Sequence, residues 1–213
     1  MTLKMVQEHM TSVFLAVCLM VAAGIPLGIS VYFFKRLKAP VLWIVEILQT
    51  IPSMALLGFV MIFLGPGTPT VVIGLFLYSL LPIVQNTYLG LSEVDPAIKD
   101  VANGMGMTRI YRLIHVEIPI AFPYIFTGIR IATVTSVGVA IFARNVGGGG
   151  IGRAIYQGIR AQNMSLIFSS TLTLMAIAIG LDTIMTFIEK YFYKRMRPSR
   201  NDNVTQRVET FGE

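Results

Sequence analysis

The sequence predicts an all-α membrane protein with about five transmembrane helices. Of its 213 residues, 54% are hydrophobic and only 13% are charged, whereas a soluble domain carries roughly 25% charged residues. The apolar residues form five uninterrupted blocks instead of the periodic stripes of a water-facing helix. Lys and Arg gather between the blocks, as in loops that set membrane topology. Lipid is therefore predicted to surround most of the chain.

The first apolar block, residues 11–34, is long enough to cross a hydrocarbon core of about 30 Å at about 1.5 Å per residue. A cleaved signal peptide is the alternative. Lys4 is the only Lys or Arg before the block, whereas three such residues follow it within 35–38. This charge order is the reverse of that in a signal peptide. We therefore expect a retained span, with residues 1–10 outside the cell.

Four further blocks follow, each near the length that a spanning helix needs. They cover residues 41–64, 70–91, 121–143 and 165–188. The connectors are a basic one at 35–38, a Gly-Pro turn at 65–69, an amphipathic stretch at 93–119 and a glycine-rich stretch, with a basic segment at 190–200 after the last block. The predicted organisation is an external N-terminus (1–10), a transmembrane domain (11–190) and a cytoplasmic tail (191–213).

The distribution of cations predicts the orientation, because Lys and Arg in short flanking segments resist translocation. With five spans, the basic sets within 35–38, 99–112 and 190–200 all fall on one face. That face is expected to be cytoplasmic. The N-terminus then lies outside and the C-terminus inside the cell.

The amphipathic stretch 93–119 is predicted to form two short helices with a bend between them. The signals are, in order, Asp95 and Pro96 as N-cap and first helical residue, Gly104 and Gly106 as interruptions, Thr108 as a second N-cap before Arg109, and Pro119 as the far limit. Each helix has an apolar face, formed by Ala97, Ile98, Val101, Ala102 and Met105 in the first and by Ile110, Leu113 and Ile114 in the second.

Helices of one or two turns are unstable alone, because nucleation costs more than so few hydrogen bonds return. The two apolar faces therefore need a packing partner. One possibility is that they fold back on the chain's own spans. The other is that they enter a groove on a cytoplasmic partner.

The spacing of this stretch resembles a known motif. Asp100-Val101-Ala102, three residues, Gly106, nine residues and Val116-Glu117-Ile118-Pro119 are similar to the coupling-helix motif of ATP-binding-cassette importer permeases. The family's pattern is Glu-Ala-Ala, three residues, Gly, nine residues, then Ile, any residue and Leu-Pro. Four positions differ here, and each keeps the chemical kind of the family residue.

In that family the bent pair docks into a groove on a separate ATPase subunit, and the resemblance implies the same role here. The implied coupling residues are Asp100, Val101, Ala102, Gly106, Arg109 and Pro119. Gly106 would permit the bend, and Asp100 would meet a basic group of the ATPase. For Arg109 and Arg112, acidic groups across the contact and lipid headgroups are both open as partners. ATP and Mg would bind to the partner, and no cofactor is expected on this chain.

Further segments resemble the permeases of osmoprotectant importers over about residues 10–190. They are Gln49-Thr50-Ile51-Pro52-Ser53, residues 81–87, Gly104-Met105-Gly106-Met107-Thr108 and residues 147–152. The resemblance implies a permease in the plasma membrane of a prokaryote, for glycine betaine, carnitine, choline or related quaternary ammonium compounds. It also implies an extracellular substrate-binding protein and a second permease, either a copy or a relative. Another small solute, such as an amino acid, is the alternative substrate.

Polar residues at membrane depth are candidates for the translocation path, because they are costly in hydrocarbon. They are Glu46, Gln49, Gln85, Asn86 and Arg130, together with Pro52, whose missing N–H frees a carbonyl. Hydrogen-bonded helix packing is the alternative role for each. A Glu46–Arg130 pair is one arrangement to test. Tyr78, Tyr88, Tyr124 and Phe142 offer aromatic faces for a quaternary ammonium group, but the sequence assigns them to no pocket.

The glycine-rich stretch that contains Arg144, Arg153 and Arg160 falls outside in this topology. We expect a partly buried, re-entrant segment in a cavity between subunits. Gly147 to Ala154 approaches a nucleotide-binding loop, but Arg153-Ala154 stand where Lys and Ser or Thr are needed. These glycines are instead expected to allow tight turns or close helix contacts.

Other classes of function are disfavoured. The net charge of +6 comes from cations between apolar blocks and not from one basic surface, so no nucleic-acid partner is expected. Cys18, His9 and His115 have no metal-ligand spacing, and no set of residues predicts an enzyme. An ion-coupled secondary transporter is the alternative of another class, although inverted repeats and several intramembrane acids, which it would need, are not evident.

Overall fold

The structure of the chain, a computed structural model, describes residues 3–196 and the side chains of residues 3–192. The described part is helical throughout, without strands. Its helices are α1 (Leu3–Phe33), α2 (Lys35–Thr50), α3 (Ser53–Leu64), α4 (Thr68–Tyr78), α5 (Leu80–Ser92), α6 (Pro96–Gly104), α7 (Arg109–Arg112), α8 (Ile118–Val139), α9 (Gly152–Arg160) and α10 (Met164–Met196). A π-helical turn, Leu113–Glu117, joins α7 to α8, and a 3₁₀ segment, Ala140–Val146, follows α8. The all-α prediction is confirmed.

Four helical units of the described chain are long and apolar enough to cross a membrane, and a bent pair of helices makes a fifth if it counts as one span. The four are Leu3–Phe33, Thr68–Ser92, Arg109–Val146 and Met164–Phe192. This agrees with the prediction of about five spans. The predicted tail 191–213 lies mostly outside the described residues.

The second predicted block, 41–64, is not one straight span. It is divided between α2 and α3, which meet at an angle of 103°. Pro52 has no N–H to donate and restricts Ile51 before it to an extended backbone, with φ −64° and ψ 131°. The basic connector 35–38 also differs from the prediction, because these residues form the first turn of α2.

Helix α5 lies at the centre of the bundle and packs most extensively against α8 and α1. Glycines allow this close approach. A Cβ on Gly28 of α1 would lie 2.5 Å from Cβ of Thr87, and a Cβ on Gly128 of α8 would lie 2.6 Å from the carbonyl oxygen of Pro82. Small residues at helix contacts are typical of membrane bundles, because close packing has to stabilise helix association where the hydrophobic effect does not act between helices.

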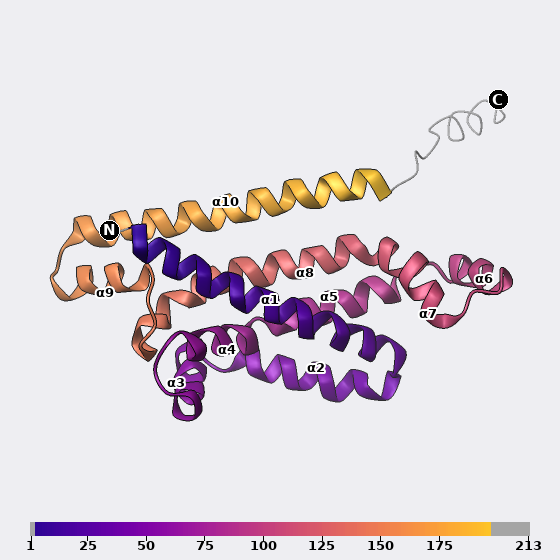
Figure 1. Cartoon of the computed structure of the whole chain (residues 1–213), viewed down its shortest axis with the longest axis horizontal. Coiled ribbons are helices and arrows are strands. Elements are labelled where there is room, and N and C mark those ends of the chain that lie inside the picture. The colour runs from indigo at the N-terminus through magenta and orange to yellow at the C-terminus, as the bar shows by residue number, and fades with distance from the viewer. Residues whose placement is uncertain (1–2, 197–213) are drawn as a thin grey trace, which may run out of the picture.

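The two ends of the bundle differ in what they carry (Figure 1). Helices α6 and α7 project from one end, and α10 runs toward that end. The start of α1 lies at the opposite end, beside α9. The start of α1 and segment 93–119 are thus at opposite ends of the bundle, while the predicted orientation, with the N-terminus outside and the C-terminus in the cytoplasm, stays a prediction.

The glycine-rich stretch packs against the beginning of α1. Gly147 and Gly150 have φ values of +77° and +106°, which favour glycine. The N–H of Gly150 donates to Oε2 of Glu8 at 3.1 Å, and a Cβ on Gly149 would collide with the Glu8 carboxylate. The expectation of tight turns and close contacts is confirmed, whereas a cavity between subunits stays a prediction.

Candidate functional site: the elbow and the intramembrane polar residues

Both predicted N-caps of segment 93–119 form. The carboxylate of Asp95 accepts a hydrogen bond from the N–H of Ala97 at 2.8 Å, and Pro96 is the first residue of α6. The hydroxyl oxygen of Thr108 accepts from the N–H of Tyr111 at 3.4 Å, before α7. We refer to residues 96–112, which comprise α6, the following turn and α7, as the elbow.

The bend of the elbow depends on Gly106, whose φ is +78°. The N–H of Gly106 donates to the carbonyl of Asn103 at 2.9 Å, and the N–H of Met107 donates to that of Ala102 at 3.1 Å. This pair of hydrogen bonds is the Schellman pattern, which ends a helix at a glycine in the left-handed conformation. A Cβ on Gly106 would meet no atom within 4 Å, so the backbone conformation, and not the available space, requires glycine.

The apolar faces of the elbow are largely uncovered by the rest of the chain. Val101, Met105 and Ile110 are 63%, 64% and 69% exposed, whereas Ala102 is buried. Six residues line a groove of about 290 Å³ on this surface: Ala97, Ile98, Val101, Ala102, Met105 and Val116. Of the two alternatives for these faces, folding back onto the chain's own spans applies to Ala102 and to Leu113, which packs in a buried cluster with Leu91, Ala121 and Ile125, but not to the exposed residues.

The charged residues of the elbow differ in their contacts within the chain, and the Nζ of Lys99 donates to the carbonyl of Leu91 at 3.1 Å. Asp100 and Arg109 are exposed. Arg112, in contrast, donates from Nε to Oε1 of Glu117 at 2.5 Å and from Nη1 to Oδ1 of Asn103. The prediction that Arg112 faces a partner or lipid headgroups is therefore wrong, because its guanidinium is used within the chain.

Pro119 also differs from its predicted role. The helix that begins at Arg109 continues through Leu113–Glu117 and α8 to Val146, so Pro119 does not end it. In a regular α-helix the ring of Pro119 would crowd the carbonyl of the residue four positions earlier. A π-helical turn of larger radius precedes it instead, and π turns are frequent at functional sites.

The predicted path residues on α2 and α5 differ in how exposed they are. Glu46 and Gln85 are exposed and Gln49 is half-buried. Pro52 is exposed at the break between α2 and α3. Asn86 donates from Nδ2 to the carbonyl of Pro82 at 2.8 Å, which satisfies the backbone group of its own helix. Helices α2 and α5 pack against each other, so the uncovered polar groups come from neighbouring helices.

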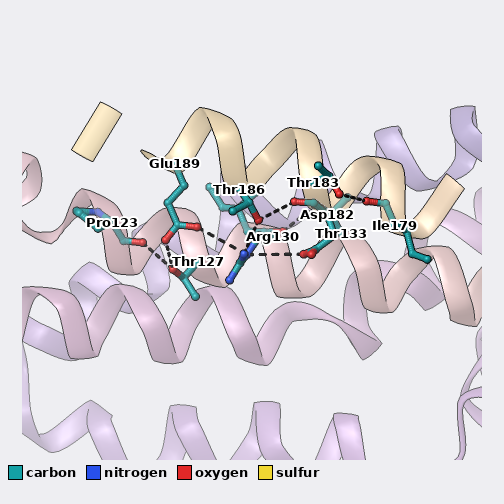
Figure 2. Close-up of polar contacts among 10 residues, drawn as sticks. Pro123, Thr127, Arg130, Thr133, Ile179, Asp182, Thr183, Thr186 and Glu189 are labelled. Carbon is teal, nitrogen blue, oxygen red and sulfur yellow. Dashed lines mark hydrogen bonds and ion pairs between the residues drawn. The ribbon is translucent and has the colours of Figure 1, made fainter. Parts of the chain in front are cut away.

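Arg130 of α8 joins a polar cluster with α10 (Figure 2). Its Nε lies 3.7 Å from Oε2 of Glu189 and 3.9 Å from Oδ1 of Asp182, and its Nη1 donates to Oγ1 of Thr186 at 2.6 Å. The hydroxyl of Thr127 donates to Oε1 of Glu189 at 2.9 Å. The considered Glu46–Arg130 pair is not formed, because the acids of α10 hold the guanidinium.

Sequence reasoning noted Asp182 as an intramembrane acid but assigned none of the α10 members of this cluster to a site. Asp182, Thr186 and Glu189 are spaced by four and three residues, so they share one helix face, and that spacing was the available signal. The four aromatic candidates do not all share one environment, and Tyr124 is exposed. Tyr78 and Phe142 pack against the main core, and the Nζ of Lys38 lies 4.7 Å from the ring centroid of Tyr88.

A family model described as "Binding-protein-dependent transport system inner membrane component" matches residues 20–198. The chain belongs to this family of permeases. It is thus a membrane-embedded transport subunit of an ATP-binding-cassette importer and not an enzyme, and the ATPase is a separate partner.

Curated relatives of the permease match most of its length. It is 40% identical over 183 residues to the osmoprotectant import permease protein OsmW of Salmonella typhimurium, covering 84% of this chain and 85% of the relative. It is 42% identical to the carnitine transport permease protein OpuCD of Listeria monocytogenes (78% and 75%) and 38% identical to the choline transport system permease protein OpuBD of Bacillus subtilis (78% and 74%).

Solved structures share the fold of the permease. It is similar to a chain of the MetNI methionine ABC transporter in an inward-facing conformation, with a TM-score of 0.79 and 21% identity over 90% of this chain and 99% of that one. A second crystal form of MetNI gives a TM-score of 0.81 at 22% identity, covering 89% and 94%.

Proposed function

We propose that the permease imports osmoprotectants of the quaternary ammonium class, such as glycine betaine, carnitine or choline. The support is that the relatives with these substrates in their names share 38–42% of their residues with the permease over about four-fifths of its length. Another small solute, such as an amino acid, is the alternative, and the MetNI transporter is the reason to test methionine.

Coupling to ATP hydrolysis is assigned to the elbow, and the exposed apolar surface at Val101 and Met105 is the observation that supports it. A surface of this kind at the end of a membrane protein needs an occupant, because exposed apolar area is costly in water. The ATPase carries ATP and Mg and receives this surface. Asp100 and Arg109 are exposed and can pair with its charged groups, Ala102 and Gly106 shape the elbow, and Pro119 lies in the first turn of α8, which connects the elbow to the bundle.

This assignment places the elbow and the C-terminal end of α10 in the cytoplasm and the start of α1 outside. Two permeases, identical or related, enclose the path, and an extracellular binding protein delivers the solute. The polar groups at Glu46, Gln49 and Gln85 face that path. Glu46 and Gln85 are exposed and Gln49 is half-buried within one chain, and a polar group at membrane depth favours a cavity. Asn86 and Arg130 instead stabilise helices next to it.

One experiment tests substrate and coupling together. The permease is co-expressed with its ATPase and binding protein, purified in detergent and reconstituted in proteoliposomes. Uptake of radiolabelled glycine betaine should require ATP on the side of the membrane that carries the ATPase. Excess carnitine or choline should reduce this uptake, whereas methionine should not. Competition by methionine alone would favour the amino-acid alternative.

The same preparation tests the other class of transporter. An ATPase that stays bound through size-exclusion chromatography supports the importer. Ion-gradient-driven uptake by the permease alone, in liposomes without ATP, would instead establish a secondary transporter and contradict the proposal.

A further inference from the structure

Arg112 connects three pieces of the coupling segment through one side chain. It is the last residue of α7, and its guanidinium donates to Asn103 of α6 and to Glu117 at the end of the π-helical turn. Arginine suits this task, because its planar group presents several donors in a fixed fork. The elbow is thus braced internally and is also tied to the residue immediately before α8.

Glu117 is an unusual partner because it is completely buried, with 0% of its surface exposed. It lies one turn from Leu113 and Ala121, which belong to a buried apolar cluster. The second carboxylate oxygen, Oε2, accepts no hydrogen bond from the described residues. Breaking the Arg112–Glu117 pair leaves a buried charge without its main partner, which is costly. The pair therefore favours one arrangement of elbow and α8.

The pair spans the point at which the long helix departs from α geometry. The π-helical turn Leu113–Glu117 lies between Arg112 and α8, and Pro119 follows in the first turn of α8. Pro119 supplies no N–H, and helices bend most readily at prolines and π turns. This turn would absorb a force applied to the elbow unless another contact stiffens it. The Arg112–Glu117 ion pair is a contact that crosses it.

We infer that Arg112 is a positioning residue for transport: through Glu117 it locks the π-helical turn, so that the elbow and α8 move as one body when the ATPase closes. The inference rests on the proposed docking of the elbow. Without the lock, the turn bends under the ATPase's motion, and ATP is hydrolysed with little movement of α8.

The test uses the complete importer in proteoliposomes, and wild-type uptake of radiolabelled glycine betaine is measured first. Hydrolysis of ATP and uptake are then followed in the same vesicles for Arg112→Gln. The ATPase should remain bound and hydrolysis should stay within about twofold of wild type, while solute taken up per ATP falls about tenfold or more. Lys190→Gln, which removes an exposed cation of α10, is the control and should keep the wild-type ratio.

A second variant keeps the inference falsifiable if Arg112→Gln does not assemble. In Arg112→Met/Glu117→Met both charges are replaced by apolar side chains of similar length, a change that commonly preserves folding. It should bind the ATPase and remain uncoupled. A wild-type ratio of uptake to hydrolysis in either assembled variant overturns the inference. Failure of both variants to assemble also overturns it, since the pair would then serve folding. Absence of ATP-driven uptake by the wild type would instead count against the proposed function.

Discussion

The turn of the elbow depends on the left-handed backbone conformation of Gly106. At a φ of +78° an L-residue crowds its own Cβ against the following carbonyl, at a cost of about 1–2 kcal/mol. Space is not the limitation, because a Cβ would meet no atom within 4 Å. Gly104, two positions earlier, also has open space but lies in ordinary helical backbone. Substitutions at Gly106 and Gly104 therefore distinguish the effect of backbone strain from the effect of added side-chain volume.

We predict that Gly106→Ala lowers ATP-driven uptake about 5- to 30-fold, the population change that a strain of 1–2 kcal/mol produces. Gly104→Ala, the matched control, should leave uptake unchanged, since alanine is favoured in helices. Uptake is measured in proteoliposomes at equal permease content. Equal effects of the two substitutions would show that the left-handed turn is not what transport requires.

At the scale of elements, the cluster around Arg130 decides how α10 is held. Only about 6% of the hydrophobic window of α10 is buried within the chain, and its main neighbours are α8 and α9. The contacts of Arg130 with Asp182, Thr186 and Glu189 (Figure 2) therefore join α10 to α8, in addition to the apolar packing of α10 residues such as Leu174 against the main core. Polar contacts between membrane helices contribute about 0.6–2 kcal/mol each.

We predict that Arg130→Gln loosens α10, because Asp182 and Glu189 lose their shared cation. The free energy of unfolding in detergent should fall by about 1–2 kcal/mol, with protease cleavage of the α9–α10 connection increased. Glu46→Gln is the stability control, as it removes an exposed carboxylate that bonds no other described residue. An unchanged unfolding curve and cleavage rate for Arg130→Gln would contradict a structural role for the cluster.

At the scale of the whole molecule, the bundle presents different surfaces at its two ends. The apolar elbow projects from one end, and α9 with the glycine-rich stretch covers the other (Figure 1). Apolar area on the sides of the bundle is covered by lipid, whereas apolar area at an end faces water. Exposure at the elbow therefore indicates a protein partner in a way that exposure along α3 or α10 does not.

We predict that Val101→Glu releases the ATPase, because a carboxylate on this face would be desolvated in the interface. The fraction of ATPase that co-purifies with the permease should fall about tenfold or more, which corresponds to about 1.4 kcal/mol or more. Ile159→Glu places the same charge on an exposed apolar residue of α9 at the opposite end and should retain the ATPase. Release by both substitutions would argue for general destabilisation instead of docking.

The lipid environment, the all-α class and the local shape of the elbow follow from residues that are close together along the chain. Long apolar blocks need lipid wherever they fold, and the caps at Asp95 and Thr108 act on backbone groups two or three residues away. The family resemblance of segment 93–119 also needed only spacing along the chain. These features depend on neighbours in sequence, so they were predictable without a structure.

Helix packing determines which groups that are distant in sequence come into contact. Arg130 pairs with acids of α10 that lie more than 50 positions later, and not with Glu46, because helix packing and not sequence spacing places them together. Pro119 lies inside a continuous helix because a π-helical turn precedes it and accommodates its ring there. Whether the elbow's apolar face would be covered or free depended on where the bundle ends, and no local pattern contains that information.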